Sequence, residues 1–306
     1  MTFIEAPAAP SRAPWRAWGQ VARLHHWVKN LLVLAPLAAA HRLNDGVLLA
    51  HASWAFFAFC LCASGIYALN DRIDRLHDRE HPDKRSRPVS DGRISPAMAS
   101  RMALVLLVLG GTLSWLTLSW QVCAVLGAYV VLGVVYSIWL KRIPVVDLFA
   151  LVAFYLLRLL AGSVAVGIAL SGWLMAFALL LFGGLALLKR YSELVLMARG
   201  GEARLSSRGY STRNLEAIWY CGLLLSMAAS LILSVYAHSA TAQDLYRNPL
   251  AFHALALLSL AWHLRAWSLA RNGRMHHDPV SFALGDRLTW AGLVLAALVL
   301  AWALLS

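Results

Sequence analysis

The sequence predicts an all-α membrane protein with nine transmembrane helices. Of its 306 residues, 60% are hydrophobic and only 14% are charged, and the mean hydropathy is +0.64. A soluble domain of this length could not bury so much apolar surface, so lipid must cover part of it. Two further observations support the same fold class: the sequence contains a series of long apolar runs, and its cations lie in the short segments between them. We expect one domain over residues 1–306, with a flexible cytoplasmic arm at 1–20.

Eight apolar runs are long enough to cross a bilayer, which takes about 20 residues. They cover residues 47–69, 97–118, 121–139, 145–167, 172–188, 213–237, 248–264 and 283–305. A ninth run, at 24–41, is weaker because Lys29 and Asn30 interrupt its start and Pro36 its middle. Charge favours this run as a span, since the arm before it and the segment 70–96 are both rich in Lys and Arg and therefore both cytoplasmic. Two crossings must lie between them.

The positive charges also predict the orientation. With nine spans, the cation-rich segments 141–142, 189–213 and 265–287 fall in the cytoplasm, and only Arg42 and Arg247 face out. The N-terminus is then cytoplasmic and the C-terminus external, in a bacterial inner membrane. The net charge of +12 fits this bias together with an anionic substrate. Nucleic acid is excluded, because the cations form no basic domain.

The polar residues that follow the second span carry the strongest chemical pattern. Asn70, Asp74 and Asp78 recur at every fourth residue, which places them on one helical stripe with Asp71 beside them. Carboxylates stacked in this way repel one another unless a cation lies among them. A hard divalent ion with oxygen ligands, Mg²⁺ bridging a diphosphate, is the natural partner. The alternative is a solvated, salt-bridged helix end, since arginines alternate with the acids.

A group of cations follows this stripe directly. Lys84, Arg85 and Arg87 lie in a loop that Pro82 and Pro88 make rigid. Guanidinium groups match the geometry of phosphate oxygens, so the loop is a candidate phosphate-binding segment. The alternative is a simple anchor on the cytoplasmic face.

Two other groups lie at the ends of predicted spans. Lys189, Arg190 and Glu193 end the sixth span, where Lys189 and Glu193 are spaced as an ordinary helical ion pair. Tyr136 and Lys141 end the fourth span, where such residues are commonly interface anchors.

Arg158 differs from these residues because it lies in the middle of an apolar run. A charge there is costly and normally faces a cavity or a partner. We therefore expect Arg158 to have a functional or partner-facing role, with a structural pair to Asp147 as the alternative.

The stretch from Asn70 to Asp78 resembles the NDxxDxxxD motif of the UbiA superfamily of membrane prenyltransferases, and the HPxKxxRP stretch after it is also similar. The resemblance implies nine transmembrane helices around a central cavity. It also implies that Asn70, Asp71, Asp74 and Asp78 bind Mg²⁺. Typical members carry a second Asp-rich motif after the sixth helix. Here Lys189-Arg190-Tyr191-Ser192-Glu193 takes its place.

The chain is more similar to the decaprenyl-phosphate phosphoribosyltransferase branch of that superfamily, in Trp27–Asn30, Tyr136–Lys141, Pro144–Asp147, Leu157-Arg158 and Lys189-Arg190. This implies transfer of 5-phosphoribosyl from phosphoribosyl diphosphate to a polyprenyl phosphate. The substrates of this reaction carry three anionic groups, which are the diphosphate and the 5-phosphate of the donor and the phosphate of the lipid. Binding them needs more cations than binding one prenyl diphosphate and a neutral acceptor.

The residues implied in substrate-phosphate binding are Lys29, Lys84, Arg85, Arg87, Tyr136, Lys141, Arg158, Lys189 and Arg190, and those implied in catalysis are Asp71, Asp74, Asp78 and Glu193. Prenyl transfer to an aromatic or other acceptor is the alternative function. Gly110-Gly111 and Gly183-Gly184 permit close packing of helices, within or between subunits, so the sequence is compatible with a homo-oligomer.

Overall fold

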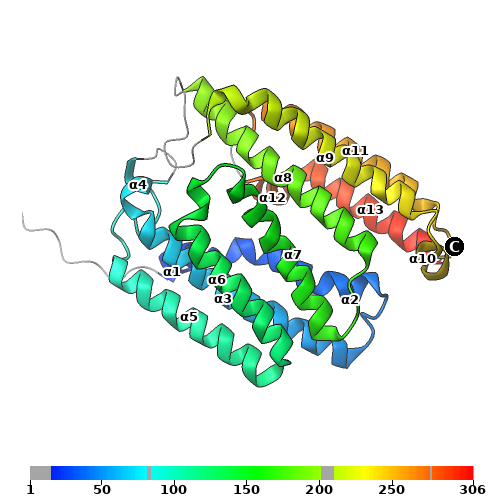
Figure 1. Ribbon diagram of the computed structural model, residues 1–306, viewed down its shortest axis with the longest axis horizontal. Helices are drawn as coiled ribbons and strands as arrows, with labels where there is room; N and C mark the ends of the chain where they lie inside the picture. The colour runs from blue at the N-terminus through cyan, green and yellow to red at the C-terminus, as the bar shows by residue number, and fades with distance from the viewer. Residues whose placement is uncertain (1–14, 81–83, 201–209, 276–277, 306) are drawn as a thin grey trace, which may run out of the picture. The chain divides into compact units, whose positions relative to one another are not determined.

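The structure, a computed structural model, describes residues 15–80, 84–200, 210–275 and 278–305, and these residues form helices joined by turns and short loops (Figure 1). The all-α prediction is confirmed. The chain divides into two compact units. Unit 1 comprises Met1–Ile138 with Ala161–Gly167, and unit 2 comprises Trp139–Leu160 with Ile168–Ser306.

Unit 1 begins with the short helix α1, and two further short helices take the place of the span predicted at 24–41. After α1 (Trp15–Ala22), Arg23 turns the chain with a φ of 49°, and the 3₁₀-helix η1 (Leu24–Leu34) leads into α2 (Ala35–Ala39). Pro36 lies in the first turn of α2. Proline has no N–H to donate to the preceding turn, so it starts a helix more readily than it continues one. The run predicted to span at 24–41 is therefore divided.

The long helices of unit 1 are α3 (Gly46–Ile73), α5 (Pro96–Thr117) and α6 (Trp120–Ile138), with the short α4 (Arg75–Glu80) after α3. Asp45 caps α3 by accepting from the backbone N–H groups of Val47 and Leu48, both at 3.2 Å. Helices α3 and α5 lie side by side (Figure 1). A Cβ at Gly110 of α5 would lie 2.6 Å from Sγ of Cys62, so glycine allows this close contact within the chain.

η1 is fixed against α3 and against the end of α7, which belongs to unit 1. Trp27 Nε1 donates to Ser64 Oγ at 3.0 Å, and Ser64 Oγ donates to the carbonyl of Ala22 at 2.8 Å. A Cβ at Gly162 would lie 1.9 Å from the carbonyl oxygen of Val33. Glycine is thus required where α7 passes the backbone of η1.

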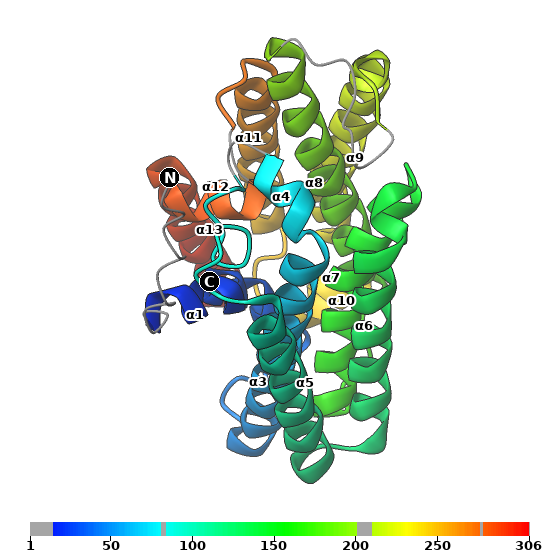
Figure 2. The ribbon, with the colours of Figure 1, turned by 90° about the vertical axis from the view of Figure 1, so that its left-hand side faces the viewer.

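Unit 2 contains most of the remaining helices. They are η2 (Leu140–Arg142), α7 (Val146–Val166) as far as Leu160, α8 (Gly172–Arg199), η3 (Thr212–Asn214), α9 (Leu215–Tyr236), α10 (Ala240–Leu245), α11 (Ala251–Arg271), α12 (Pro279–Gly285) and α13 (Arg287–Leu305). Helices α8, α9 and α11 are neighbours (Figure 2). Their core includes Leu188, Leu194, Ile218 and Trp267. This packing holds the end of α8, which carries the polar group predicted at 189–193.

Within the part of the chain that the structure describes, seven helical segments are long and apolar enough to cross a membrane: α3, α5, α6, α7, α8, the segment Thr212–Tyr236 and α13. The protein is therefore an integral membrane protein. Helix α11 has 21 residues and matches the predicted span at 248–264, but His253, His263 and Arg265 make it less apolar. With the first run divided as well, the predicted count of nine is not reached within the described residues.

Candidate active site

The aspartate stripe lies where α3 ends and α4 begins, in unit 1. Helix α3 ends at Ile73, yet the backbone N–H of Asp74 donates to the carbonyl of Asn70 at 2.9 Å and that of Asp78 to the carbonyl of Asp74 at 2.8 Å. These bonds continue the helical register across the break. Asn70 Nδ2 also donates to Asp74 Oδ2 at 3.1 Å. The spacing expected from the sequence thus survives the one-residue interruption.

Two of the carboxylates in this stripe are buried and paired with arginines. Asp71 is 2% exposed and Asp78 is 4% exposed. Arg23 Nη2 lies 2.6 Å from Asp71 Oδ1, while Arg87 Nη1 lies 2.7 Å from Asp78 Oδ2 and 3.4 Å from Asp71 Oδ1. Arg79, one of the interleaved arginines, donates to the carbonyl of Ser90 at 2.6 Å. The positive charge that the aspartates need is therefore supplied in part by the guanidinium groups of Arg23 and Arg87.

The carboxylate and amide oxygens at the junction of α3 and α4 could supply some of the ligands of a Mg²⁺ ion. Asp71 and Asp78 come close enough together to share one nitrogen of Arg87, and carboxylate and amide oxygens are the hard ligands that Mg²⁺ prefers. Across the described ranges, no group of three or more His, Cys, Asp or Glu side chains is gathered closely enough to hold a metal ion. Mg²⁺ is usually bound by one or two carboxylates, with water and substrate phosphates completing its shell. This arrangement suits a metal that arrives with a diphosphate.

The cations predicted around the aspartates differ in their surroundings. Arg87 contacts two of the aspartates, Lys84 is partly exposed in the same loop and Arg85 is exposed. Lys29 in η1 and Tyr136 in α6 are partly exposed. Pro82 lies outside the described residues. The structure therefore brings Arg87 of this loop directly to two of the aspartates.

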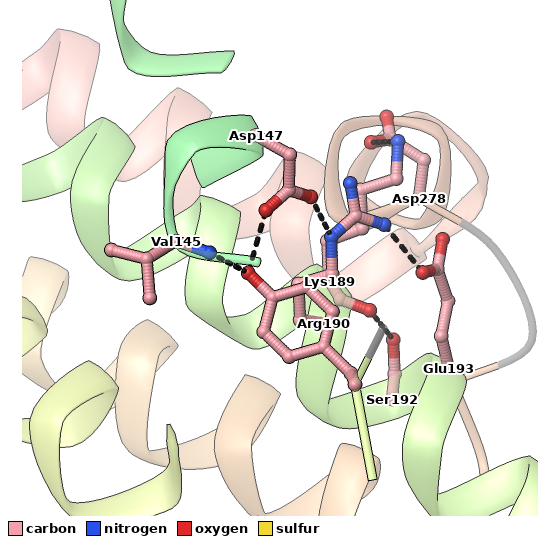
Figure 3. Close-up of polar contacts among 8 residues, drawn as sticks. Val145, Asp147, Lys189, Arg190, Ser192, Glu193 and Asp278 are labelled. Carbon is pink, nitrogen blue, oxygen red and sulfur yellow. Dashed lines mark hydrogen bonds and ion pairs between the residues drawn. The ribbon is translucent and has the colours of Figure 1, made fainter. Parts of the chain in front are cut away.

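A second polar group lies in unit 2, at the end of α8. Arg190 Nε donates to Asp147 Oδ2 at 2.7 Å, and Arg190 Nη1 donates to Glu193 Oε2 at 2.5 Å (Figure 3). The side chains of Arg190 and Asp147 are both 0% exposed, whereas that of Glu193 is 31% exposed. Two carboxylates thus hold one guanidinium inside the protein.

Tyr210 belongs to this group, although nothing in its sequence neighbourhood points to it. Its hydroxyl donates to Asp147 Oδ1 at 2.6 Å and accepts from the backbone N–H of Val145 at 2.8 Å. Burial and the hydrogen bond to Asp147 raise the pKa of Tyr210, so the hydroxyl stays protonated. Tyr210 therefore acts as a fixed donor to Asp147.

Lys189 and Glu193 each contact a further charged residue. Glu193 accepts from Arg190, and Lys189 Nζ lies 3.6 Å from Asp278 Oδ1 (Figure 3). The structure thus shows an i, i+3 ion pair between Arg190 and Glu193 on α8.

The partners of Asp147 are Arg190 and Tyr210. Arg158 is 3% exposed, donates to the carbonyl of Phe154 at 2.6 Å and lies 5.7 Å from the ring centroid of Tyr155. Lys141 in η2 is 7% exposed. Both cations are thus buried, and the functional or partner-facing role expected for Arg158 stays a prediction.

Comparison with known proteins decides the family. The sequence profile of the UbiA prenyltransferase family matches residues 31–284. The chain belongs to the UbiA prenyltransferase family. A UbiA homologue from Archaeoglobus fulgidus, solved bound to GPP and Mg²⁺, has the same fold with a TM-score of 0.67, at 17% identity over 94% of this chain and 98% of that one.

Similar sequences include proteins with different names. Decaprenyl-phosphate phosphoribosyltransferases from Corynebacterium glutamicum and Mycobacterium tuberculosis are 37% identical over 253 residues and 34% identical over 290. These alignments cover 78% and 92% of this chain and 74% and 89% of those proteins. Nodulation protein NoeC of Azorhizobium caulinodans is 33% identical over 277 residues, 90% of this chain and 89% of that protein. The UbiA-family protein described here is a membrane transferase.

Proposed function

We propose that this UbiA-family enzyme transfers a 5-phosphoribosyl group from phosphoribosyl diphosphate to a polyprenyl phosphate of the decaprenyl type and releases diphosphate. The observation that carries the proposal is the group at the end of α8. Where typical members of the superfamily have a second Asp-rich motif, this chain has Lys189, Arg190 and Glu193, with Arg190 bound to Asp147 and Glu193. Such a group offers no aspartate pair for a second metal-bound diphosphate. The names of the phosphoribosyltransferase relatives support the same assignment.

The aspartates of unit 1 would serve the diphosphate of the donor. Asn70, Asp71, Asp74 and Asp78 would hold Mg²⁺, which when bound supplies positive charge to the leaving diphosphate. Arg87 already lies beside Asp71 and Asp78. As the C1–O bond breaks, negative charge grows on the diphosphate, and a guanidinium placed there beforehand stabilises it.

The remaining phosphates would be bound by other cations of the predicted set, which are Lys29, Lys84, Arg85, Lys141, Arg158 and Lys189, with Tyr136. The lipid phosphate attacks C1 of the ribose and is already ionised near neutral pH. The reaction therefore needs no strong general base, and positioning and charge account for the rate. The distribution of Lys and Arg in the sequence favours a cytoplasmic location for this chemistry.

The test is a transfer assay with the purified protein in detergent. Labelled phosphoribosyl diphosphate, Mg²⁺ and a polyprenyl phosphate should give a labelled product that partitions into chloroform. A parallel reaction supplies a polyprenyl diphosphate and an aromatic acceptor. Prenylation of the aromatic acceptor without any phosphoribosyl lipid would overturn the proposal and establish the prenyltransferase alternative.

A further inference from the structure

A continuous series of hydrogen bonds crosses the interior of unit 2 and ends at Glu193. The backbone N–H of Val145 donates to Oη of Tyr210 at 2.8 Å, and Oη donates to Oδ1 of Asp147 at 2.6 Å. The other oxygen of Asp147 accepts from Nε of Arg190, whose Nη1 donates to Glu193 (Figure 3). Of the three ionised groups, only Glu193 has exposed surface, at 31%. The series therefore has a buried middle, and the ionised group at its end, Glu193, is partly exposed.

The burial of Arg190 argues against a direct role in binding phosphate. Its side chain is 0% exposed and two of its nitrogens already donate to carboxylates. The three ionised groups together carry one net negative charge, which repels a phosphate and suits an uncharged hydrogen-bond donor. The guanidinium instead fixes the direction of the Glu193 carboxylate, because two donor atoms of one planar group are held at once.

The backbone at the other end of the series is strained. Val145 has a φ of 69°, a conformation that β-branched residues rarely adopt. Strain of this kind persists only where the surrounding structure holds it. The hydroxyl of Tyr210 does so by accepting the Val145 N–H, and it connects this turn to Asp147 in the first turn of α7. The order of the turn thus depends on Tyr210.

We propose that Tyr210, Asp147 and Arg190 are positioning residues, which hold the carboxylate of Glu193 so that it accepts hydrogen bonds from the ribose hydroxyls of the donor substrate. This assignment rests on the proposed function. A carboxylate accepts from hydroxyl groups through charge-assisted bonds, which are stronger than neutral ones. A site built in this way selects ribose over a sugar that lacks the hydroxyl, because the deoxy sugar leaves the carboxylate without its donor.

The experiment compares phosphoribosyl diphosphate with its 2-deoxy and 3-deoxy analogues and measures the ratio of kcat/KM for the parent to that for each analogue. The wild-type enzyme should prefer the parent compound over at least one analogue. Glu193→Gln should lower this preference on the order of tenfold or more, the size expected for a hydrogen bond to a charged group. Tyr210→Phe, which keeps the ring and removes the hydroxyl, should lower it in the same direction. Tyr236→Phe removes a hydroxyl near the far end of α9 and should keep the wild-type ratio.

A second variant separates positioning from stability. Glycine adopts positive φ without strain, so Val145→Gly combined with Tyr210→Phe should recover part of the thermal stability lost in Tyr210→Phe alone. The preference should stay lowered, because Asp147 still lacks its donor. A double variant that recovers stability and preference together would show that Tyr210 has a purely structural role.

Other outcomes are also decisive. An unchanged preference in Glu193→Gln overturns the assignment, and this partly exposed position provides the measurement if Tyr210→Phe does not fold. A wild-type enzyme that forms phosphoribosyl lipid but shows no preference for the hydroxyls overturns it as well. Absence of any phosphoribosyl lipid from the wild-type protein, with prenyl transfer present, rejects the proposed function itself.

Discussion

Arg190 and Asp147 form an ion pair in which Nε lies 2.7 Å from Oδ2 and neither side chain has exposed surface. A buried pair adds little net stability, because removing two charges from water costs about as much as their attraction returns. Breaking it is different, since the buried guanidinium of Arg190 then keeps only the partly exposed carboxylate of Glu193. The pair joins the first turn of α7 to the last part of α8 and so determines where Glu193 lies.

Asp147→Asn should therefore destabilise the protein strongly. Loss of one partner of a buried pair costs roughly 3–5 kcal/mol, which thermal unfolding of the detergent-solubilised protein would detect. Asp147→Asn combined with Arg190→Gln should be less destabilised than the single variant, because the fully buried carboxylate and the fully buried guanidinium are removed together. A double variant as unstable as the sum of both single variants would contradict this view of the pair.

Asp74→Ala should abolish the Mg²⁺-dependent transfer activity. Asp74 is partly exposed and accepts from Asn70, so the change should leave the fold intact while it removes a predicted ligand. Removal of a residue that only supports a metal ligand typically lowers metal affinity or activity by roughly 10- to 100-fold. We expect the loss of transfer activity in Asp74→Ala to be at least as large. The control is Asp91→Ala, which removes an exposed carboxylate that pairs with Arg93. Equal rates for the two variants in a Mg²⁺ titration would exclude Asp74 from the metal site.

Gly162→Ala should be much more harmful than Gly111→Ala. The added methyl group at position 162 would lie 1.9 Å from the carbonyl oxygen of Val33, whereas nothing lies within 4 Å at position 111. Overpacking of this kind costs roughly 1–3 kcal/mol, while alanine in an open helical position gains about 0.5–1 kcal/mol over glycine. The unfolding temperatures of the two variants should move in opposite directions. Equal shifts would show that η1 yields to the methyl group.

Acid should weaken the protein through Asp286. Hydrogen bonds from Arg265, at 2.7 and 2.8 Å, and from Thr289 lower the pKa of Asp286 from 3.8 to about 2. A lowered pKa in the folded state means that the stabilisation is present above 3.8 and is lost as the pH falls toward 2. Asp286→Asn should therefore be less sensitive to acid between pH 4 and pH 2 than the wild type, measured by thermal unfolding. Asp244→Asn, at an exposed position, should keep the wild-type sensitivity.

The helical architecture was predictable because it follows from composition and run length. Lipid as solvent forces long apolar helices, and helix α3 covers the predicted run at 47–69 with four further residues at its end. The division of the first run was less predictable. Pro36 and Lys29 show that it is weak, but whether such a segment becomes one helix or two depends on contacts with α3, such as the bond from Trp27 to Ser64.

The sequence was enough to predict which types of residue make up the candidate site. It was not enough to predict which of them contact one another. The i, i+4 spacing of Asn70, Asp74 and Asp78 follows from helical geometry, and their backbone bonds confirm it. The partnership of Arg23 with Asp71 could not be predicted, because the two residues are 48 positions apart. The contact of Tyr210 with Asp147 could not be predicted for the same reason, since the two residues are 63 positions apart.

The arginine shared by Asp71 and Asp78 is a built-in competitor for any cation that those aspartates bind. A cation that takes these oxygens must displace Arg87, and the displaced guanidinium is then left beside the cation without a counter-charge. An anion that enters at the same time restores the balance. Cation and anion should therefore each tighten the binding of the other by the same factor, as thermodynamic linkage requires. Neither a divalent ion alone nor a diphosphate alone would then measure the true affinity of the aspartates.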